Sequence, residues 1–585
     1  MTDLTPAPER PTGLGLSLEG LALLALALLF TTWFAGWPGG LPTWGPGLLL
    51  GGLLGTWAVR CRPRLARPHP ETAVAVALAL AYRLPALLHP WGLVNRDGAY
   101  GAFVALRLLA GQRPAPVFTE GANYQGTLKG HLAALFSLLT GSRDLSLGLT
   151  IVGTLLSLVF ILSSMALARR LGGRGAALTT GLYLAMGPKF LTIFCLNSVG
   201  QYADVLALGG LALALLARQL DLDLSGWRAR GHYLGFGLLL GAAFWQQPVA
   251  LAYAATAGLV LLLRRRTWRD PWAVLAGLGF LVGALPLLLW NLQHDWASGD
   301  IMGRDSDLLW AQAVALPALI QQTLTVAFPI LAGLSPGHPW SAWPLIPTLA
   351  TLLLPSLLVG FVALTGRQSW RGLRDARPSS ASLPPLLMVC SLAFCWSVAS
   401  GLVYSRPRYL LPVMAASSVH LGVVAAWAWN RSRALTAGAL AALVAFGAVA
   451  TLPRLGQCAA VEEYYRTVVR SLEDKGIRTG YADFSISAPV TMFTAEKIVL
   501  SPRLGPTPAY ESELQEQRVA REGPDAFVLT SSDDVDAFAA TLTRLGVSFR
   551  FEASPLPVFY QLSKKVAVEE VWGYRRQQEA PVPDE

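Results

Sequence analysis

Charged residues are scarce in this chain. Only 14% of its 585 residues are Asp, Glu, Lys or Arg, whereas 53% are hydrophobic, and the mean hydropathy is +0.46. A water-soluble enzyme of this length carries far more charge, because its surface must be solvated. The composition therefore excludes a soluble globular protein and favours a chain that lies mostly in lipid.

Motifs that bind metals or nucleotides are missing as well. The five cysteines include no C-x-x-C pair and lie mostly in or beside apolar segments, so they predict neither a zinc site nor a disulfide framework. Walker A, H-E-x-x-H, G-x-S-x-G and dinucleotide-binding sequences are also absent. ATP-driven transport and the common hydrolase and dehydrogenase chemistries therefore lose their usual sequence support.

Long hydrophobic runs are what the chain has in abundance. A membrane-spanning helix needs about 20 apolar residues. The first run has no convincing cleavage site after it, so it predicts a retained helix rather than a signal peptide. The runs predict about thirteen spans, at 16–37, 43–60, 72–90, 146–168, 175–195, 198–218, 233–247, 248–263, 273–290, 343–364, 384–403, 409–428 and 434–452.

Basic clusters between the runs predict the orientation. Cytoplasmic loops are enriched in Arg and Lys, and here the clusters fall in every second loop, at 60–67, 169–174, 228–230, 264–269, 367–377 and 431–433. The N-terminus is then cytoplasmic, and an odd number of spans places the chain after Pro453 outside. Because these clusters account for much of the formal net charge of +10, we expect no nucleic-acid partner.

Two outside segments are long enough to hold structure of their own. In the first, 99–110 and 128–139 have the spacing of amphipathic helices, which we expect to lie along the membrane surface. In the second, 310–333 predicts an interfacial or re-entrant helix, because a further span there would break the alternation of charge.

The composition becomes that of a water-soluble domain after residue 453. A charged helix at 461–475 is followed by alternating strands and helices, which predict a small α/β domain. The predicted strands are 480–486, 497–500, 526–529, 547–551 and 558–562, with a helix at 533–545. The predicted fold is thus an α-helical polytopic membrane domain at 1–453, an extracytoplasmic α/β domain at 454–576 and a disordered tail at 577–585.

Asp97 is the outstanding candidate for chemistry. It lies at the outer end of the third predicted span, and a carboxylate above an apolar bundle can act as a general base toward an acceptor hydroxyl or amine. The alternative role is that of an N-cap for a helix starting at Ala99. The two roles are compatible.

An arginine pair, Arg406 and Arg408, stands at the outer mouth between two spans. Guanidinium groups suit phosphate, because they are permanently charged and can donate two hydrogen bonds at once. The alternative is that these side chains reach lipid headgroups.

Other polar residues allow two interpretations each. Lys189 and Asp204 can form a structural ion pair or line a polar cavity that opens outward. Trp245 and Gln246 can contact a sugar, or they can be ordinary residues of the membrane interface. His294 can be a ligand or proton relay, or part of a solvated loop with Asp295.

Several of these segments resemble the C-type (GT-C) membrane glycosyltransferases. The resemblance is to the family 39-like branch, which includes protein O-mannosyltransferases and the aminoarabinose transferase of lipid A, and it covers roughly residues 72–428. The order and sidedness of the motifs are more specific than any single motif. The resembling residues are Asp97 with Tyr100, YQGTL at 124–128, QYAD at 201–204, FWQQP at 244–248, PLLLWNLQH at 286–294 and RYLLP at 408–412.

The resemblance implies a mechanism. In the family the first-loop aspartate is the proposed base, and the donor is typically a polyprenyl monophosphate sugar. By resemblance, Asp97 deprotonates the acceptor, which attacks the anomeric carbon with inversion, while Arg408, helped by Arg406 and Lys189, holds the leaving phosphate. The residues assigned to the substrate cavity are Tyr100, Tyr124, Lys129, Gln201, Tyr202, Asp204, Trp245, Gln246, His294 and Tyr409.

The chain also departs from the family pattern. Many relatives carry glutamate after the aspartate, where this chain has Gly98, and some carry an acidic residue where Lys129 stands. A second carboxylate is therefore lacking. We predict no metal ligand and no cofactor, and a divalent metal is without support.

The resulting prediction is an envelope glycosyltransferase that crosses the cell (inner) membrane many times. Its partners are the bilayer, a polyprenyl-phosphate sugar and an acceptor that is a protein, lipid or glycan. The alternative is a transporter or flippase of a lipid-linked sugar, which needs similar arginines but no base. Transporter folds commonly contain repeats, and no internal repeat is evident here.

Overall fold

The described part of the chain is mainly helical, with strands confined to two small sheets. The predicted spans at 16–37 and 43–60 and the predicted tail at 577–585 lie outside the described residues. The computed structural model describes residues 69–111, 116–120, 122–197, 199–222, 226–264, 267, 270–302, 316–334, 339–343, 345–375, 377–398, 407–504, 513–530, 535–567 and 570–571.

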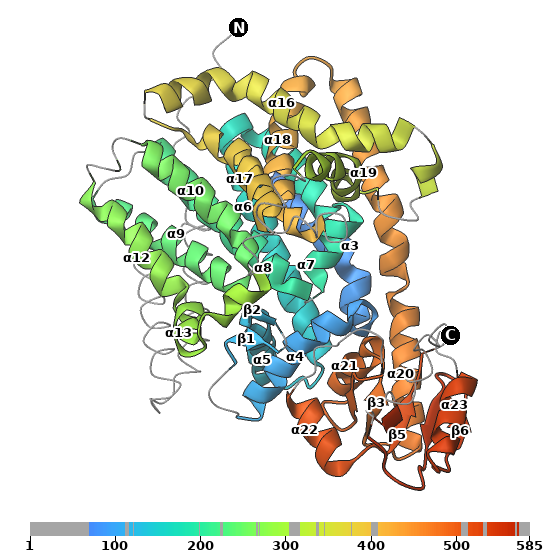
Figure 1. Ribbon diagram of the computed structural model, residues 1–585. Helices are drawn as coiled ribbons and strands as arrows, with labels where there is room; N and C mark the ends of the chain where they lie inside the picture. Colours follow the sequence, from blue (N-terminus) through green and yellow to red (C-terminus); the bar gives the residue numbers. More distant parts are fainter. Residues whose placement is uncertain are drawn as a thin grey trace, which may run out of the picture.

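Long apolar helices pack side by side to form the body of the molecule (Figure 1). Many of their large side chains remain exposed, among them Leu84, Val359 and Leu435, as expected of faces that meet lipid. The long helices are α3 (Pro70–Leu88), α6 (Leu145–Ala185), α8 (Tyr202–Leu222), α9 (Gly226–Gln246), α10 (Leu251–Leu263), α12 (Val274–Gly283), α13 (Leu285–Gln293), α16 (Leu345–Arg374), α17 (Leu383–Val398), α18 (Leu411–Trp429) and α19 (Arg433–Gly456).

Helix α6 folds back on itself at Gly173. This residue has φ 75° and ψ −163°, a conformation that glycine adopts and other residues avoid. A Cβ on Gly181 would lie 2.7 Å from the sulfur of Met165, so the two halves of α6 run side by side. They correspond to the spans predicted at 146–168 and 175–195.

The second of these predicted spans is too long. Helix α6 ends at Ala185, and Gly187 and Pro188 separate it from the short helix α7 (Lys189–Leu196). Proline has no backbone N–H to continue a helix and restricts the residue before it. The chain therefore starts a new helix at Lys189 instead of continuing to residue 195.

The number of thirteen spans is not confirmed. Within the described residues, seven helices are long and apolar enough to cross a membrane, or eight if α12 and α13, bent by 56°, form one span. This number treats the two halves of α6 as one helix and leaves out the shorter α10. Leu316–Ala332 is a shorter apolar helix, as expected for the segment predicted to be interfacial or re-entrant.

The segment predicted as the first outside loop holds both predicted helices, α4 (Arg96–Leu109) and α5 (Leu128–Thr140). A short 3-10 helix, η1 (Pro90–Leu93), precedes α4. Between α4 and α5 the chain forms an antiparallel hairpin that the sequence did not predict, from β1 (Phe118–Thr119) and β2 (Ala122–Gly126). Helices and hairpin lie together at one end of the bundle (Figure 1).

Helix α19 leads directly into α20 (Cys458–Asp474). Gln457, between them, has helical backbone angles, so the span predicted at 434–452 and the charged helix predicted at 461–475 form one helical run. Figure 1 shows this run extending from the apolar bundle to the strands near the C-terminus.

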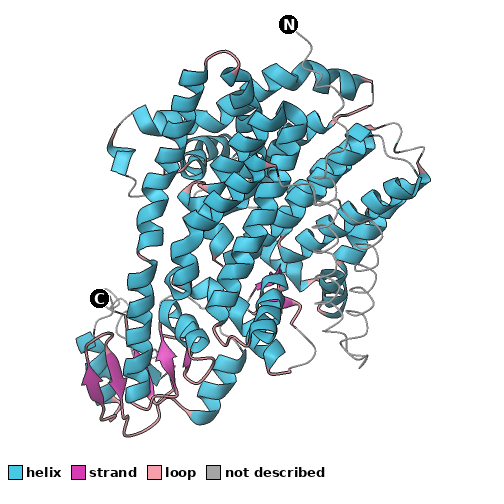
Figure 2. Ribbon diagram, turned by 180° about the vertical axis from the view of Figure 1, so that it is seen from behind, coloured by secondary structure: helices cyan, strands magenta, loops and turns pink. Residues whose placement is uncertain are grey.

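The C-terminal residues form a five-stranded sheet in the order β4-β3-β5-β7-β6, at the end of the molecule that carries the first outside loop (Figure 2). Strand β3 is parallel to β4 and β5, whereas β7 is antiparallel to β5 and β6. Two helices here were not predicted, α21 and α22. The elements are β3 (Thr479–Ala482), α21 (Phe484–Phe493), β4 (Val499–Ser501), α22 (Glu513–Glu522), β5 (Ala526–Val528), α23 (Val535–Arg544), β6 (Arg550–Glu552) and β7 (Val558–Tyr560).

The strand predicted at 480–486 is shorter than expected. It ends at Ala482, because the Asp483 carboxylate accepts a hydrogen bond of 2.7 Å from the backbone N–H of Ser485 and caps α21. An aspartate in this position favours a helix start over a continued strand.

Candidate functional site

Asp97 lies in the first turn of α4. The N-cap of this helix is Asn95, whose side-chain oxygen accepts a hydrogen bond of 2.8 Å from the backbone N–H of Gly98. The alternative prediction, that Asp97 caps a helix starting at Ala99, is therefore wrong. Asp97 is half-buried, and the N-terminal end of a helix stabilises its negative charge.

Arg408 comes from a part of the sequence far from Asp97. It belongs to the 3-10 helix η10 (Pro407–Leu410), which leads into α18, and it is half-buried within electrostatic range of the Asp97 carboxylate. Its Nε is buried without a hydrogen-bond partner. A guanidinium that keeps an unused donor beside a carboxylate is suited to an anionic ligand.

Tyr202 connects Arg408 to three other residues. The ring of Tyr202 is buried at the start of α8, with its centroid 6.3 Å from that of Tyr409, edge to face. Its hydroxyl accepts a hydrogen bond of 3.5 Å from Nε2 of Gln247, and Tyr124 in β2 is in electrostatic range. The described structure thus brings residues from α4, β2, α8, the end of α9 and η10 to one place.

Gly200 makes room for the Tyr202 ring. It has φ 65°, and a Cβ at this position would lie 2.3 Å from the ring of Tyr202. Any other residue would be strained at this positive φ, and its Cβ would clash with the Tyr202 ring.

Lys129 and Asp204 form a buried pair of opposite charges behind this site. Both side chains are fully buried. The Lys129 ammonium donates a hydrogen bond of 2.9 Å to the carbonyl of Asn197 and is attracted by Asp204, whose oxygens have no hydrogen-bond partner. The ion pair considered between Lys189 and Asp204 is not formed, because Asp204 has Lys129 as its charge partner.

Lys189 lies apart from the other predicted phosphate ligands. It is half-buried at the first residue of α7, and in the described part of the chain no hydrogen bond or ion pair joins it to Asp97, Asp204 or Arg408. Arg406, the other predicted helper of Arg408, lies outside the described residues.

Trp245 and Gln246 hold the hairpin in place. The Trp245 indole is buried and donates a hydrogen bond of 3.0 Å to the carbonyl of Val117. Oε1 of Gln246 accepts one of 3.1 Å from the backbone N–H of Leu128, at the start of α5. Their contacts are therefore with the protein, and the predicted sugar contacts are not available to the buried indole.

Tyr100 and His294 both contact neighbouring aromatic rings. The Tyr100 ring is buried and packs edge to face on Phe103, with centroids 5.3 Å apart, and its place in the cavity stays a prediction. His294 is exposed and stacks on Trp290 with centroids 4.1 Å apart. Gln201 is buried, with φ 54°.

Gln247 is the second amide of the motif FWQQP at 244–248, and it is Gln247, rather than its neighbour Gln246, that contacts Tyr202. One buried cation escaped the sequence analysis. Arg83 is buried within α3 and donates hydrogen bonds to the carbonyl of Ala185 at 2.8 Å and the hydroxyl of Ser157 at 3.0 Å. A lone arginine inside an apolar run was the available signal.

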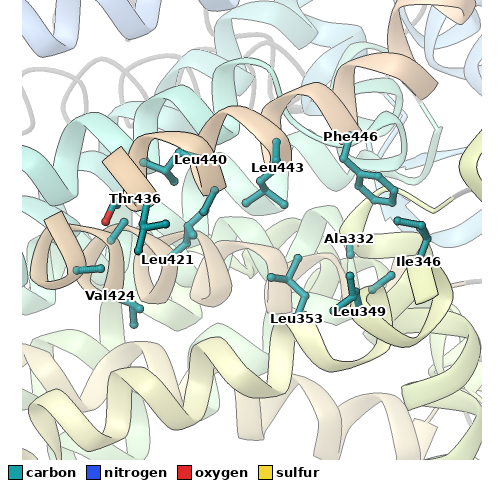
Figure 3. A pocket seen from close by; sticks show the side chains of 16 residues that line it. Ala332, Ile346, Leu349, Leu353, Leu421, Val424, Thr436, Leu440, Leu443 and Phe446 are labelled. Atoms are coloured by element: carbon teal, nitrogen blue, oxygen red, sulfur yellow. The ribbon is translucent and has the colours of Figure 1, made fainter. Parts of the chain in front are cut away.

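The described residues contain no group of three or more His, Cys, Asp or Glu side chains placed to hold a metal ion. A separate apolar cavity of about 550 Å³ lies between α16, α18 and α19 (Figure 3). Its walls are almost wholly hydrocarbon, and the hydroxyl of Thr436 already donates to the carbonyl of Ser432. Such a cavity suits apolar groups only.

Comparison with known proteins agrees with this architecture. Residues 127–290 match the family described as dolichyl-phosphate-mannose-protein mannosyltransferase. No curated protein sequence matches the chain.

Two solved structures resemble the chain over most of its length. The crystal structure of ArnT from Cupriavidus metallidurans bound to undecaprenyl phosphate is 14% identical, covers 84% of this chain and 98% of its own, and has a TM-score of 0.51. The Archaeoglobus fulgidus oligosaccharyltransferase in complex with Zn and sulfate is 12% identical, covers 83% of this chain and 72% of its own, and has a TM-score of 0.48. Residues 127–290 are thus similar to this mannosyltransferase family, and the chain shares its overall fold with ArnT.

Proposed function

We propose that the protein transfers a sugar from a polyprenyl-phosphate-linked donor to an acceptor on the extracytoplasmic face of the membrane. The observation that carries the proposal is that Asp97 and Arg408, far apart in the sequence, lie within electrostatic range of each other at one end of an apolar bundle. ArnT, which has this fold, was solved with undecaprenyl phosphate, and this supports a carrier of the same class.

Each residue has a defined part in the proposed reaction. The Asp97 carboxylate takes the proton from the acceptor hydroxyl or amine. The acceptor atom then bonds to the anomeric carbon from the face opposite the phosphate, the carbon–oxygen bond to phosphate breaks, and the configuration inverts. The bonding electrons leave with polyprenyl phosphate, whose charge Arg408 stabilises. Tyr202 and Tyr409 keep the guanidinium in place.

The sidedness follows from the positive-inside rule. Arg169 and Arg170, in the first half of α6, contact Glu71 and Asp221 at the start of α3 and the end of α8. These helix ends are opposite to those that carry Arg83, Tyr202 and the first outside loop. We therefore assign the basic end to the cytoplasm and the end with Asp97 and the C-terminal sheet to the extracytoplasmic side of the cell membrane.

The test separates chemistry from donor binding. Asp97→Asn should lower sugar transfer from a polyprenyl-phosphate donor about 10²- to 10⁴-fold, because the amide cannot accept the proton, while binding of undecaprenyl phosphate to the purified protein stays within about two-fold. Arg408→Ala should weaken that binding about 10- to 100-fold, as expected when a charged hydrogen bond of about 1.5–3 kcal/mol is lost.

Asp536→Asn is the matched control, since this aspartate is exposed in the first turn of α23. It should leave both measurements at the wild-type level. Full transfer by the Asp97→Asn protein would refute the base, and unchanged donor binding by Arg408→Ala would refute the phosphate ligand.

A further inference from the structure

The segment that carries Asp97 is held on both sides by the C-terminal part of the chain. We call residues 89–109, which include η1 and α4, the Asp97 segment. In the C-terminal part of the chain it packs against α20 and α21, and in the rest of the chain against α5 and α6. The C-terminal part contacts this segment both before and after Asp97 in the sequence. These contacts can therefore fix the position of the Asp97 carboxylate.

Before Asp97, the Trp91 ring is enclosed between two side chains of the C-terminal part. It stacks on the Phe493 ring with centroids 3.9 Å apart and planes 6° from parallel. The guanidinium carbon of Arg466 lies 4.5 Å from the centroid of the Trp91 ring. Arg466 is itself oriented by an ion pair of 2.7 Å with Glu462 on the same helix. Stacking and cation–π contacts of this kind fix an indole in orientation as well as position.

The backbone next to Trp91 lies directly on α20. A Cβ on Gly92 would be 2.4 Å from the Cα of Cys458 and 2.6 Å from its Cβ. This spacing leaves no room for a side chain on Gly92. The turn before Asp97 is therefore in direct backbone contact with the helix that leads into the C-terminal sheet.

After Asp97, α4 packs on α21. The Tyr100 ring lies 5.9 Å from that of Phe484, and both belong to a buried cluster that includes Ala488 and Met492. Further along α4, Arg107 attracts the carboxylate of Glu496 in the turn that follows α21. The same helix of the C-terminal part thus contacts the chain on both sides of the carboxylate.

We propose that Trp91 and Phe493 are positioning residues, and that through them the C-terminal part of the chain sets the place of Asp97. This rests on the proposed role of Asp97 as the base. A general base must lie within hydrogen-bond reach of the proton that it takes. A displacement of about 1 Å can lower the rate about 100-fold, so loss of the stack should lower turnover without touching the phosphate ligands.

The test uses the full-length protein with Trp91→Ala, Phe493→Ala and the conservative variant Trp91→Phe. Both alanine variants should lower kcat about 10- to 100-fold while binding of undecaprenyl phosphate stays within about two-fold, because Arg408 is not displaced. Trp91→Phe retains a ring against Phe493 and should recover most of the lost turnover. Phe551→Ala is the control, since Phe551 is an exposed phenylalanine of edge strand β6.

A folded alanine variant with wild-type kcat, or one that loses turnover and donor binding together, would overturn the proposal. If an alanine variant does not fold, as judged by size-exclusion chromatography, Phe493→Leu replaces it with the same expected result.

A double variant links the effect to Asp97. Where two residues act through one step, their effects are not additive, so Phe493→Ala should lower the residual rate of the Asp97→Asn protein no further. An added 10-fold loss there would refute the positioning role. Full activity of Asp97→Asn alone would instead refute the base, so the two failures remain distinct.

Discussion

Nε2 of Gln247 donates a hydrogen bond of 3.5 Å to the hydroxyl of Tyr202, and both side chains are buried. The contact joins the residue that follows α9 to the start of α8. Tyr202 is also in electrostatic range of Arg408. The orientation of the proposed phosphate ligand therefore depends on residues that do not themselves bear a charge at neutral pH.

Removal of the Tyr202 hydroxyl should weaken donor binding modestly. A net contribution of about 0.5–1.5 kcal/mol per hydrogen bond predicts that Tyr202→Phe lowers the affinity for undecaprenyl phosphate about 2- to 10-fold. Tyr253→Phe is the matched control, because Tyr253 is equally buried but its hydroxyl has no hydrogen-bond partner. Equal effects of the two substitutions would show that the hydroxyl of Tyr202 has no special part in binding.

The sequence predicted some of this site and not the rest, for physical reasons. Asp97 and Arg408 could be found because a charge near the membrane is costly and stands out against apolar neighbours. The surroundings of Tyr100 could not be found in this way, because its ring also packs on Phe484 of α21, nearly four hundred positions later in the chain. Local spacing contains no information about such a contact.

Helix positions were easier to predict than helix partners. Apolar periodicity located most helices, since a span must be apolar along its length. The partner of Asp204 is Lys129, on α5, rather than the nearer Lys189. This choice depends on how α5 packs against α4 and α6, which hydropathy does not encode. The β1–β2 hairpin was missed for a similar reason, since Trp245 and Gln246 of α9 hold it from outside.

The pair of Lys129 and Asp204 should behave as one unit in folding. Removing one of two buried charges that attract each other leaves the other uncompensated and typically costs about 3–5 kcal/mol, whereas replacing both with apolar residues costs far less. Lys129→Met and Asp204→Leu should therefore each lower the midpoint of thermal unfolding in detergent strongly. The double variant should recover much of the loss. Additive losses would show that the two charges do not depend on each other.

Gly173 should be required for the turn within α6. Gly173→Ala places an L residue at φ 75°, which costs about 1–3 kcal/mol of backbone strain, although no heavy atom lies within 4 Å of the new Cβ. Gly175→Ala is the matched control in the same turn, since its Cβ would meet only Ala426 at 3.7 Å. It should raise stability slightly, because alanine favours helix more than glycine does. Thermal unfolding in detergent measures both changes.

Glu496 should make stability depend on pH. Burial raises the pKa of its carboxyl above the ordinary value of 4.5, and the attraction of Arg107 and Arg518 only partly opposes this. A carboxyl whose pKa is raised by folding contributes its stability fully below pH 4.5, and the contribution is lost as the pH rises through the folded-state pKa.

The glutamine side chain of the Glu496→Gln variant cannot ionise, so the variant should not show this loss of stability with rising pH. The unfolding midpoint of the variant should therefore increase relative to that of the wild-type protein as the pH rises from about 4 to about 7. This is the range over which a glutamate with a raised pKa titrates. Glu463→Gln, at an exposed glutamate on α20, is the control and should follow the wild-type curve. If the difference in unfolding midpoint between Glu496→Gln and the wild-type protein stays constant across this range, the prediction is wrong. The attraction of Arg107 and Arg518 would then fully offset the cost of burying the Glu496 carboxylate.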